Sequence, residues 1–223
     1  MKQTVPALAL LLSLAACGGA STEQTKTEEK KEAAATTGAA YAIDTVASAV
    51  QWRATHKGGF APRFGVIKVT NGSLNVDNGA VTGGSFDVNM NSLTTDPAAV
   101  TEAGKKSTDL DGHLKSGDFF DVAKYPSAKF VITAVAPYDS AKQKSLLPGA
   151  TNLISGNLTL KDSTLNITFP AQIAVNGNDV TANAKFVIDR SAWGISYKTE
   201  GSPENWMISK EVEIGFSVKG TKK

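Results

Sequence analysis

The sequence has very few of the residues that metal or thiol chemistry requires. It contains one cysteine, Cys17, and two histidines, His56 and His113, in 223 residues. A single cysteine excludes an intramolecular disulfide and leaves no second thiol to join the histidines in a metal site. The glycine-rich phosphate loops and the Gly-x-Ser-x-Gly elbow of serine hydrolases are also missing. These gaps argue against an enzyme, a metal centre and a bound cofactor.

Charge of one sign is also lacking. The 23 Lys and Arg residues and 21 Asp and Glu residues give a net charge of +2 and are interspersed along the chain. Nucleic-acid-binding proteins instead carry a basic patch or stripe. The sequence therefore predicts no nucleic-acid partner, and it leaves any protein partner unspecified.

The chain begins with the pattern of an export signal. Lys2 precedes an apolar run from Val5 to Leu12, which is too short to span a bilayer. The run ends in Leu14-Ala15-Ala16-Cys17, which resembles the bacterial lipobox, where cleavage leaves a lipid-modified cysteine as the first residue. This interpretation also explains a lone cysteine in an exported protein. We therefore expect a signal peptide over residues 1–16 and a lipoprotein held through Cys17 to a membrane of a bacterial cell envelope, facing the periplasm or the outside.

The next segment has the composition of a linker. Residues 18–40 are mostly Ala, Thr, Glu and Lys, and none is aromatic or a branched aliphatic. Such a segment buries too little apolar surface to offset the entropy of ordering it. We expect the lipidated cysteine and a flexible tether over 17–40, followed by one domain over 41–223 that is long enough for a single core.

The remainder of the chain alternates apolar and polar residues with the period of β-strands. One clear run places Val50, Trp52, Ala54 and His56 on one face, and another places Val212, Ile214, Phe216 and Val218 on one face. Hairpin turns are predicted at Asn71-Gly72, Asn78-Gly79 and Asn176-Gly177, because Asn-Gly favours the type I′ turn. About eight strands joined mostly by hairpins indicate either a sandwich or an up-and-down barrel.

Residues 107–130 break this period. Thr108 and Asp111 have the spacing of a capping pair, and a short helix is expected to follow and to end at Gly117. Two adjacent aromatic residues, Phe119 and Phe120, come next. This segment is either a plug over one mouth of a barrel or a surface crossover between two strands.

Several segments together are similar to the YceI-like family of exported lipid-binding proteins. They are Tyr41-Ala42-Ile43-Asp44, VQWRATHKGG, DLDGHLKSGDFFDVAKYPSAKF, NLISGNLTLKD and FVIDRSAWGI, in the family's order, and they cover essentially all of residues 41–219. The chain departs from the family at residues 47–49, where Ala-Ser-Ala replaces a frequent His-Ser. The resemblance implies an all-β, eight-stranded antiparallel lipocalin-like barrel with short helices capping one end. It also implies that a long isoprenoid lipid, of the polyprenyl or isoprenoid quinone type, binds inside as cargo to be carried or stored.

Residues on the apolar strand faces are the candidate lipid contacts. A barrel of eight strands is wide enough either to be filled by its own side chains or to hold one slender ligand. Small residues such as Ala54 and Ala134 mixed with larger ones favour a channel, or they fill the taper of the barrel. The predicted lining is Val50, Trp52, Ala54, Phe86, Val88, Phe130, Ile132, Ala134, Ile167, Phe186, Ile214 and Phe216.

Two other functions remain open at this point. The loop around Trp193, Tyr197 and Trp206 could present an aromatic patch to a protein partner, or it could simply cap the barrel. Alternatively, His56 with a nearby aspartate could serve as acid and base in an enzyme acting on a bound lipid.

Overall fold

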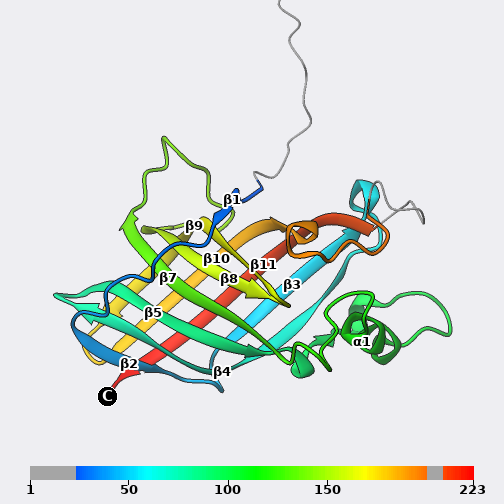
Figure 1. Ribbon diagram of the computed structural model, residues 1–223, viewed down its shortest axis with the longest axis horizontal. Coiled ribbons are helices and arrows are strands. Elements are labelled where there is room, and N and C mark those ends of the chain that lie inside the picture. The colour runs from blue at the N-terminus through cyan, green and yellow to red at the C-terminus, as the bar shows by residue number, and fades with distance from the viewer. Residues whose placement is uncertain (1–23, 200–207) are drawn as a thin grey trace, which may run out of the picture.

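Eight long antiparallel strands form a closed barrel in the computed structural model, which describes residues 24–199 and 208–223 (Figure 1). The predicted eight-stranded barrel is confirmed. Its strands are β3 (Ala49–His56), β4 (Arg63–Asp77), β5 (Ala80–Asn89), β7 (Ser127–Pro137), β8 (Asn152–Leu160), β9 (Ser163–Asn176), β10 (Asp179–Asp189) and β11 (Ile208–Lys222).

Shorter elements complete the described chain. Three are strands: β1 (Thr27–Glu29), β2 (Ala39–Ile43) and β6 (Thr94–Thr95). The described residues form one α-helix, α1 (Ser107–Lys115), and four 3-10 turns, η1 (Lys57–Gly59), η2 (Met90–Ser92), η3 (Pro97–Ala99) and η4 (Arg190–Trp193).

The barrel closes because each strand pairs antiparallel with two neighbours. The order runs from β9 through β10, β11, β4, β5 and β7 to β8, and β8 pairs back onto β9. One position in this order is shared. Between β11 and β4, β2 occupies one end of the barrel and β3 the other. We call the β3 end the mouth and the β2 end the base.

Two of the three predicted Asn-Gly hairpins are confirmed and one is wrong. Turns at Asn78-Gly79 and after Asn176 join β4 to β5 and β9 to β10. At Asn71-Gly72, however, β4 continues through a bulge and still pairs with β5. A Cβ atom at Gly72 would lie 2.6 Å from the Ser85 carbonyl oxygen, so glycine is needed for the close approach of two strands rather than for a turn.

The predicted flexible tether is wrong for residues 24–40. Strand β1 pairs with β9, the Ala34 N–H donates to the Ile132 carbonyl of β7 at 2.9 Å, and the Thr82 hydroxyl of β5 donates to the Thr37 carbonyl at 2.9 Å. Composition predicted disorder because this segment has no core residues of its own. Main-chain hydrogen bonds to the barrel wall order it instead. We call residues 24–38 the strap.

The predicted signal peptide and Cys17 lie outside the described residues. Within residues 24–199 and 208–223, no helix has the length and apolar character needed to cross a bilayer.

Candidate functional site

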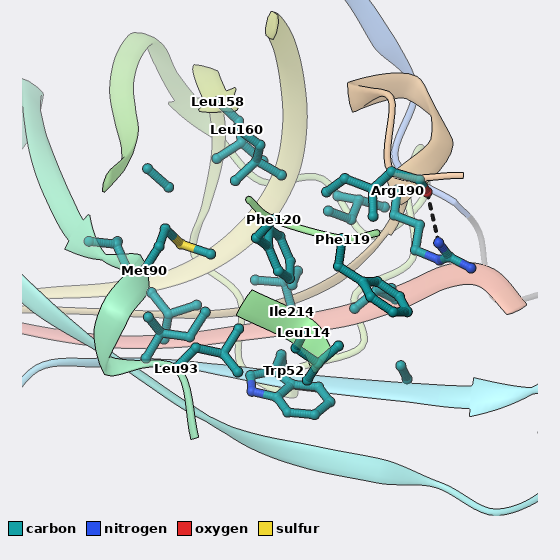
Figure 2. A pocket seen from close by; sticks show the side chains of 18 of the residues that line it. Trp52, Met90, Leu93, Leu114, Phe119, Phe120, Leu158, Leu160, Arg190 and Ile214 are labelled. Atoms are coloured by element: carbon teal, nitrogen blue, oxygen red, sulfur yellow. Dashed lines mark hydrogen bonds between the residues drawn. The ribbon is translucent and has the colours of Figure 1, made fainter. Parts of the chain in front are cut away.

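The mouth half of the barrel contains a cavity of about 360 Å³ (Figure 2). Its wall is almost entirely apolar, with side chains contributed by all eight long strands and by the segments over the mouth. The volume falls within the usual range of pockets for small molecules. The sequence left open whether the barrel is filled or hollow, and the structure has a hollow mouth half above a packed base.

Five phenylalanine side chains form the floor of this cavity. Phe169 and Phe186 stack with ring centroids 4.1 Å apart, and the remaining pairs lie 5.6 to 6.3 Å apart in tilted or edge-on arrangements, which are favourable for aromatic rings. The five residues are Phe86, Phe130, Phe169, Phe186 and Phe216. They all lie on inward strand faces, and the packed base begins below them.

The floor depends on Gly156 of β8. A Cβ atom built at this position would overlap the Phe130 ring, so only glycine leaves room for that ring. We expect Gly156→Ala to lower the free energy of unfolding by about 1 to 3 kcal/mol, the usual cost of overpacking a core. Chemical denaturation would measure the change.

A second glycine provides the control for that prediction. A Cβ atom at Gly112, in α1, would meet nothing within 4 Å. Gly112→Ala should therefore stabilise the protein by about 0.5 to 1 kcal/mol, because alanine is the better helix former. Equal stability of the Gly156→Ala variant and the wild-type protein would show that the Phe130 ring is free to move aside.

The roof of the cavity is the segment that the sequence predicted as a plug or a crossover. Leu110 and Leu114 of α1, together with Phe119 and Phe120, line the cavity, so the plug interpretation is confirmed. Phe119 is only 5% exposed, and Phe120 is partly buried against the core.

The predicted capping pair on this helix is wrong. The Asp109 carboxylate accepts from the Lys106 N–H at 3.2 Å and so caps the helix. Asp111 instead accepts from the Thr95 N–H at 2.6 Å and ties α1 to β6. Helical spacing predicted the helix correctly. Asp109 and Asp111 both lie near its start, and the sequence pattern did not show which of them is the cap.

Arg190, the first residue of η4, lies beside the roof. Its side chain is 5% exposed, and its guanidinium carbon lies 5.7 Å from the centre of the Phe119 ring. Burial lowers the pKa of this guanidinium from its usual value. Main-chain oxygens stabilise the charge, because the side chain donates to the carbonyls of Ile195 at 2.8 Å, Tyr197 at 2.9 Å, Ser209 at 3.1 Å and Ile208 at 3.3 Å.

Few polar groups along the wall remain available to a ligand. Arg63 donates to the Ala99 carbonyl at 2.7 Å and forms an ion pair with Glu102. Among residues 24–199 and 208–223, two buried side-chain nitrogens, Nδ1 of His56 and Nε1 of Trp52, have no hydrogen-bond partner, and both residues line the cavity. Within this part of the chain, no aspartate pairs with Nδ1 of His56, so the acid-base pair suggested for an enzyme is not seen there.

Ten of the twelve predicted lining residues do line the cavity. They are Val50, Trp52, Ala54, Phe86, Val88, Phe130, Ile167, Phe186, Ile214 and Phe216. Ile132 is buried, but it is not part of the cavity wall. Ala134 is exposed, because a bulge between Ile132 and Ala134 shifts the register by one residue and turns Ala134 outward. Alternation predicts faces only while the strand stays regular.

The twelve predicted residues leave out several lining residues on regular strand faces, together with the residues of the roof and of the η2 region. Helical spacing could have identified Leu110 and Leu114, whereas no local pattern marks Met90 and Leu93 of the η2 region. The lining residues outside the predicted set are Thr55, His56, Arg63, Ile67, Met90, Leu93, Leu110, Leu114, Phe119, Phe120, Ala128, Lys129, Leu158, Leu160, Phe169, Ile188, Arg190, Ile195, Ile208 and Val212.

Two of the three aromatic residues of the loop, Trp193 and Tyr197, pack against the rest of the protein. Trp193 is 1% exposed, and Tyr197 packs edge-on against His113 with ring centroids 5.1 Å apart. These two residues therefore cap the barrel. Trp206 lies outside the described residues.

Comparisons with known proteins agree on one domain type. A family model described as a YceI-like domain matches residues 41–220. A UPF0312 protein of Shewanella denitrificans is 30% identical over 141 residues, which is 62% of this chain and 64% of that protein, so the match spans slightly less than two thirds of the relative. One from Enterobacter sp. strain 638 is 29% identical over 77% of this chain and 79% of its own length.

Solved structures have the same fold at low identity. BcnA of Burkholderia cenocepacia superimposes with a TM-score of 0.58 and 22% identity, covering 80% of this chain and 99% of BcnA. A polyisoprenoid binding domain from Saccharophagus degradans, implicated in plant cell wall breakdown, gives a TM-score of 0.53 and 14% identity over 83% and 99% of the two chains. At these identities the likeness concerns the fold alone.

Proposed function

The chain belongs to the YceI-like domain family, and from that premise we propose that it binds one long isoprenoid chain inside the barrel, as a carrier or store at the bacterial cell envelope. The observation that carries the proposal is the cavity, which is floored by phenylalanine rings and roofed by α1, Phe119 and Phe120. The polyisoprenoid binding named for the Saccharophagus degradans domain supports the same ligand class.

The chemistry of the wall favours a ligand recognised mainly by its tail. An apolar wall gains about 0.8 kcal/mol for each CH₂ group that it removes from water, whereas it offers a hydrogen bond at very few points. His56 lines the cavity near the mouth, and its buried Nδ1 has no partner among the described residues, so a small shift of this side chain would let it contact a polar group of the ligand. The polar contact then positions the head group, and the tail supplies most of the affinity.

Binding without turnover fits the wall best. General acid-base catalysis needs a titratable group within hydrogen-bond reach of the reacting atom and a partner that orients it. The described wall offers His56 without an aspartate at Nδ1, and two arginines whose donors are directed at carbonyls or at Glu102. We therefore propose a binding protein rather than an enzyme.

Affinity should rise with the length of the isoprenoid tail and then level off. One five-carbon unit supplies roughly 3 to 4 kcal/mol of gross burial energy, before the cost of ordering the chain and taking it from the membrane. Titrating the purified protein with isoprenols of increasing length, and following tryptophan fluorescence, would test this, because Trp52 lies in the cavity wall.

The matched control holds the tail constant and varies the head group among alcohol, quinone and hydrocarbon. Affinity that follows the head group and ignores the tail would contradict the carrier function. It would favour an enzyme or an interaction module instead.

We propose further that Cys17 is lipidated and attaches the protein to a membrane, as the lipobox-like sequence Leu14-Ala15-Ala16-Cys17 indicates. Cys17→Ala should abolish incorporation of labelled palmitate and move the protein from the membrane fraction to the soluble fraction. The barrel should fold unchanged, because residue 17 precedes every described barrel contact. Palmitate incorporation into the variant would refute the assignment.

A further inference from the structure

The barrel wall has a seam between β9 and β10. These strands pair from the Asn176–Asp179 turn as far as Ala171 and Ala184, and then the pairing stops. The next residue of β9 is Pro170, which has no N–H to donate to a neighbouring strand. Each strand remains paired with its other neighbour: β9 pairs with β8 as far as Ser163, and β10 pairs with β11 as far as Asp189. Residues 163–170 and 185–189 therefore face each other without direct pairing.

The strap occupies this seam. Thr27, Glu28 and Glu29 of β1 pair antiparallel with Ile167, Asn166 and Leu165 on the free edge of β9. On the other side, Gln24 forms a parallel bridge with Val187 of β10, and the Thr25 N–H donates to the Val187 carbonyl at 2.8 Å. From there the strap crosses the wall toward β2 (Figure 1). The wall is thus completed by a segment from the far end of the chain.

The seam borders the cavity. Ile167 and Phe169 on β9, and Phe186 and Ile188 on β10, all line the cavity. Ladder pairing is also interrupted between β4 and β5 near the mouth, but there β6 pairs with β4 and the Ser92 hydroxyl accepts from the Lys68 N–H. At the β9–β10 seam, the strap is the segment that covers the gap. The seam can therefore open without breaking any β9–β10 main-chain pair.

Polar contacts hold much of the strap, and at its first residues Thr25 and the apolar Val187 of β10 are both buried. All three residues of β1 are exposed. The Asn157 side chain accepts from the Lys31 N–H at 3.0 Å and donates to the Lys31 carbonyl at 2.7 Å. Beside it, Asn166 is 1% exposed, and its Oδ1 atom has no hydrogen-bond partner in the described part of the chain.

Such an interface separates at low cost. Water can hydrogen-bond both asparagines once the strap leaves, whereas an apolar surface would be penalised for becoming wet. The unpartnered Asn166 Oδ1 also raises the free energy of the closed state, because a buried acceptor without a partner is unfavourable. Segments with few buried apolar contacts open most readily in native proteins.

A side-chain hydrogen bond also spans the seam, just after the C-terminal end of β10. The buried Trp193 indole, which follows β10, donates to the Leu158 carbonyl of β8 at 3.0 Å. This bond links the end of β10 to β8 across β9. Inside the barrel, the Phe169 and Phe186 rings, one from each edge, stack with centroids 4.1 Å apart. Separating the two edges therefore requires the release of the strap, the loss of the Trp193 hydrogen bond and the separation of these two rings.

We propose that the β9–β10 seam is the lateral portal through which the ligand enters and leaves, and that strap residues 24–31 are its gate. This inference rests on the proposed function, since it gives the route of the same ligand. A lateral portal suits a long apolar chain, because the tail passes sideways into the cavity while the roof stays in place.

A reversible disulfide that fixes the strap to the β9 edge of the seam tests the gate. In a Cys17→Ala background, Glu29→Cys and Leu165→Cys place two thiols at directly opposite positions of β1 and β9. The control pair, Thr181→Cys with Lys219→Cys, lies at opposite positions of β10 and β11, where the wall is continuous. Stopped-flow transfer of a bound fluorescent isoprenol to phosphatidylcholine vesicles gives the exchange rate, and circular dichroism checks the fold of each form.

The oxidised Glu29–Leu165 variant should exchange ligand at least about tenfold more slowly than its reduced form, because gating motions set such rates. Dithiothreitol should restore the rate, and the equilibrium affinity should stay the same. The control variant should exchange ligand at the same rate in its oxidised and reduced forms. The Trp193→Phe variant should exchange ligand faster than the wild-type protein. Equal rates in the oxidised and reduced forms of the seam variant would overturn the portal. Absence of ligand binding in every reduced protein would overturn the proposed function itself.

Discussion

Replacing both Phe119 and Phe120 with serine is expected to destabilise the domain by several kcal/mol. Phe119 is 5% exposed and contributes about 2 to 3 kcal/mol of apolar burial, while Phe120 is partly exposed and contributes less. The change also opens the roof to water, so isoprenoid affinity should fall. Thermal and chemical unfolding of the double variant would measure the loss of stability.

Phe60 offers a matched control for the roof variant. It is also a phenylalanine close to the mouth, but it is 73% exposed. Phe60→Ser should leave the midpoint of unfolding nearly unchanged, since surface substitutions usually have small effects. An unchanged midpoint in the Phe119 and Phe120 double variant as well would place the roof outside the cooperative core.

A charge introduced into the cavity wall should abolish binding. Ile214 of β11 projects into the cavity beside Trp52 and Leu114 (Figure 2). Ile214→Lys sets a cation against an apolar tail with no counter-ion, which costs several kcal/mol. Since each 1.4 kcal/mol is a factor of ten, the dissociation constant should rise at least about a hundredfold. Fluorescence titration with the tightest isoprenol would measure it.

Ile214→Met is the control, because it keeps an apolar side chain of similar volume and should change affinity little. Both variants should show the circular dichroism of the wild-type protein. Wild-type affinity in a folded Ile214→Lys variant would show that the ligand does not occupy this cavity. Ile132, which alternation also predicted in the wall, is unsuitable for this test because it lies outside the cavity.

The sequence alone predicted most of what repeats locally. Side chains alternate along a strand with a period of two, so ten of the twelve predicted lining residues point into the cavity. The helix of residues 107–115 and two of the three hairpins followed from equally local signals. The leader and its cysteine are a local pattern too, and their assignment stays a prediction.

Only the tertiary structure decided how these pieces combine. The outward turn of Ala134 results from a bulge, and bulges depend on a partner strand that the local pattern does not specify. The bend at Asn71-Gly72 has the sequence of a hairpin, but β4 pairs straight through it because β5 can approach the glycine closely.

The strap and the cavity follow the same rule. Residues 24–38 carry no pattern that predicts order, because their order comes from hydrogen bonds to β5, β7, β8 and β9, far away in the sequence. Composition likewise does not distinguish a filled barrel from a hollow one. The five phenylalanine rings contact one another across the middle of the barrel and fill it there. The volume between these rings and the mouth stays open, because the roof residues cover the mouth but do not fill that volume. Sequence periodicity thus predicted which side chains point inward, whereas contacts between distant segments decided whether the inward side chains surround a cavity or fill the barrel.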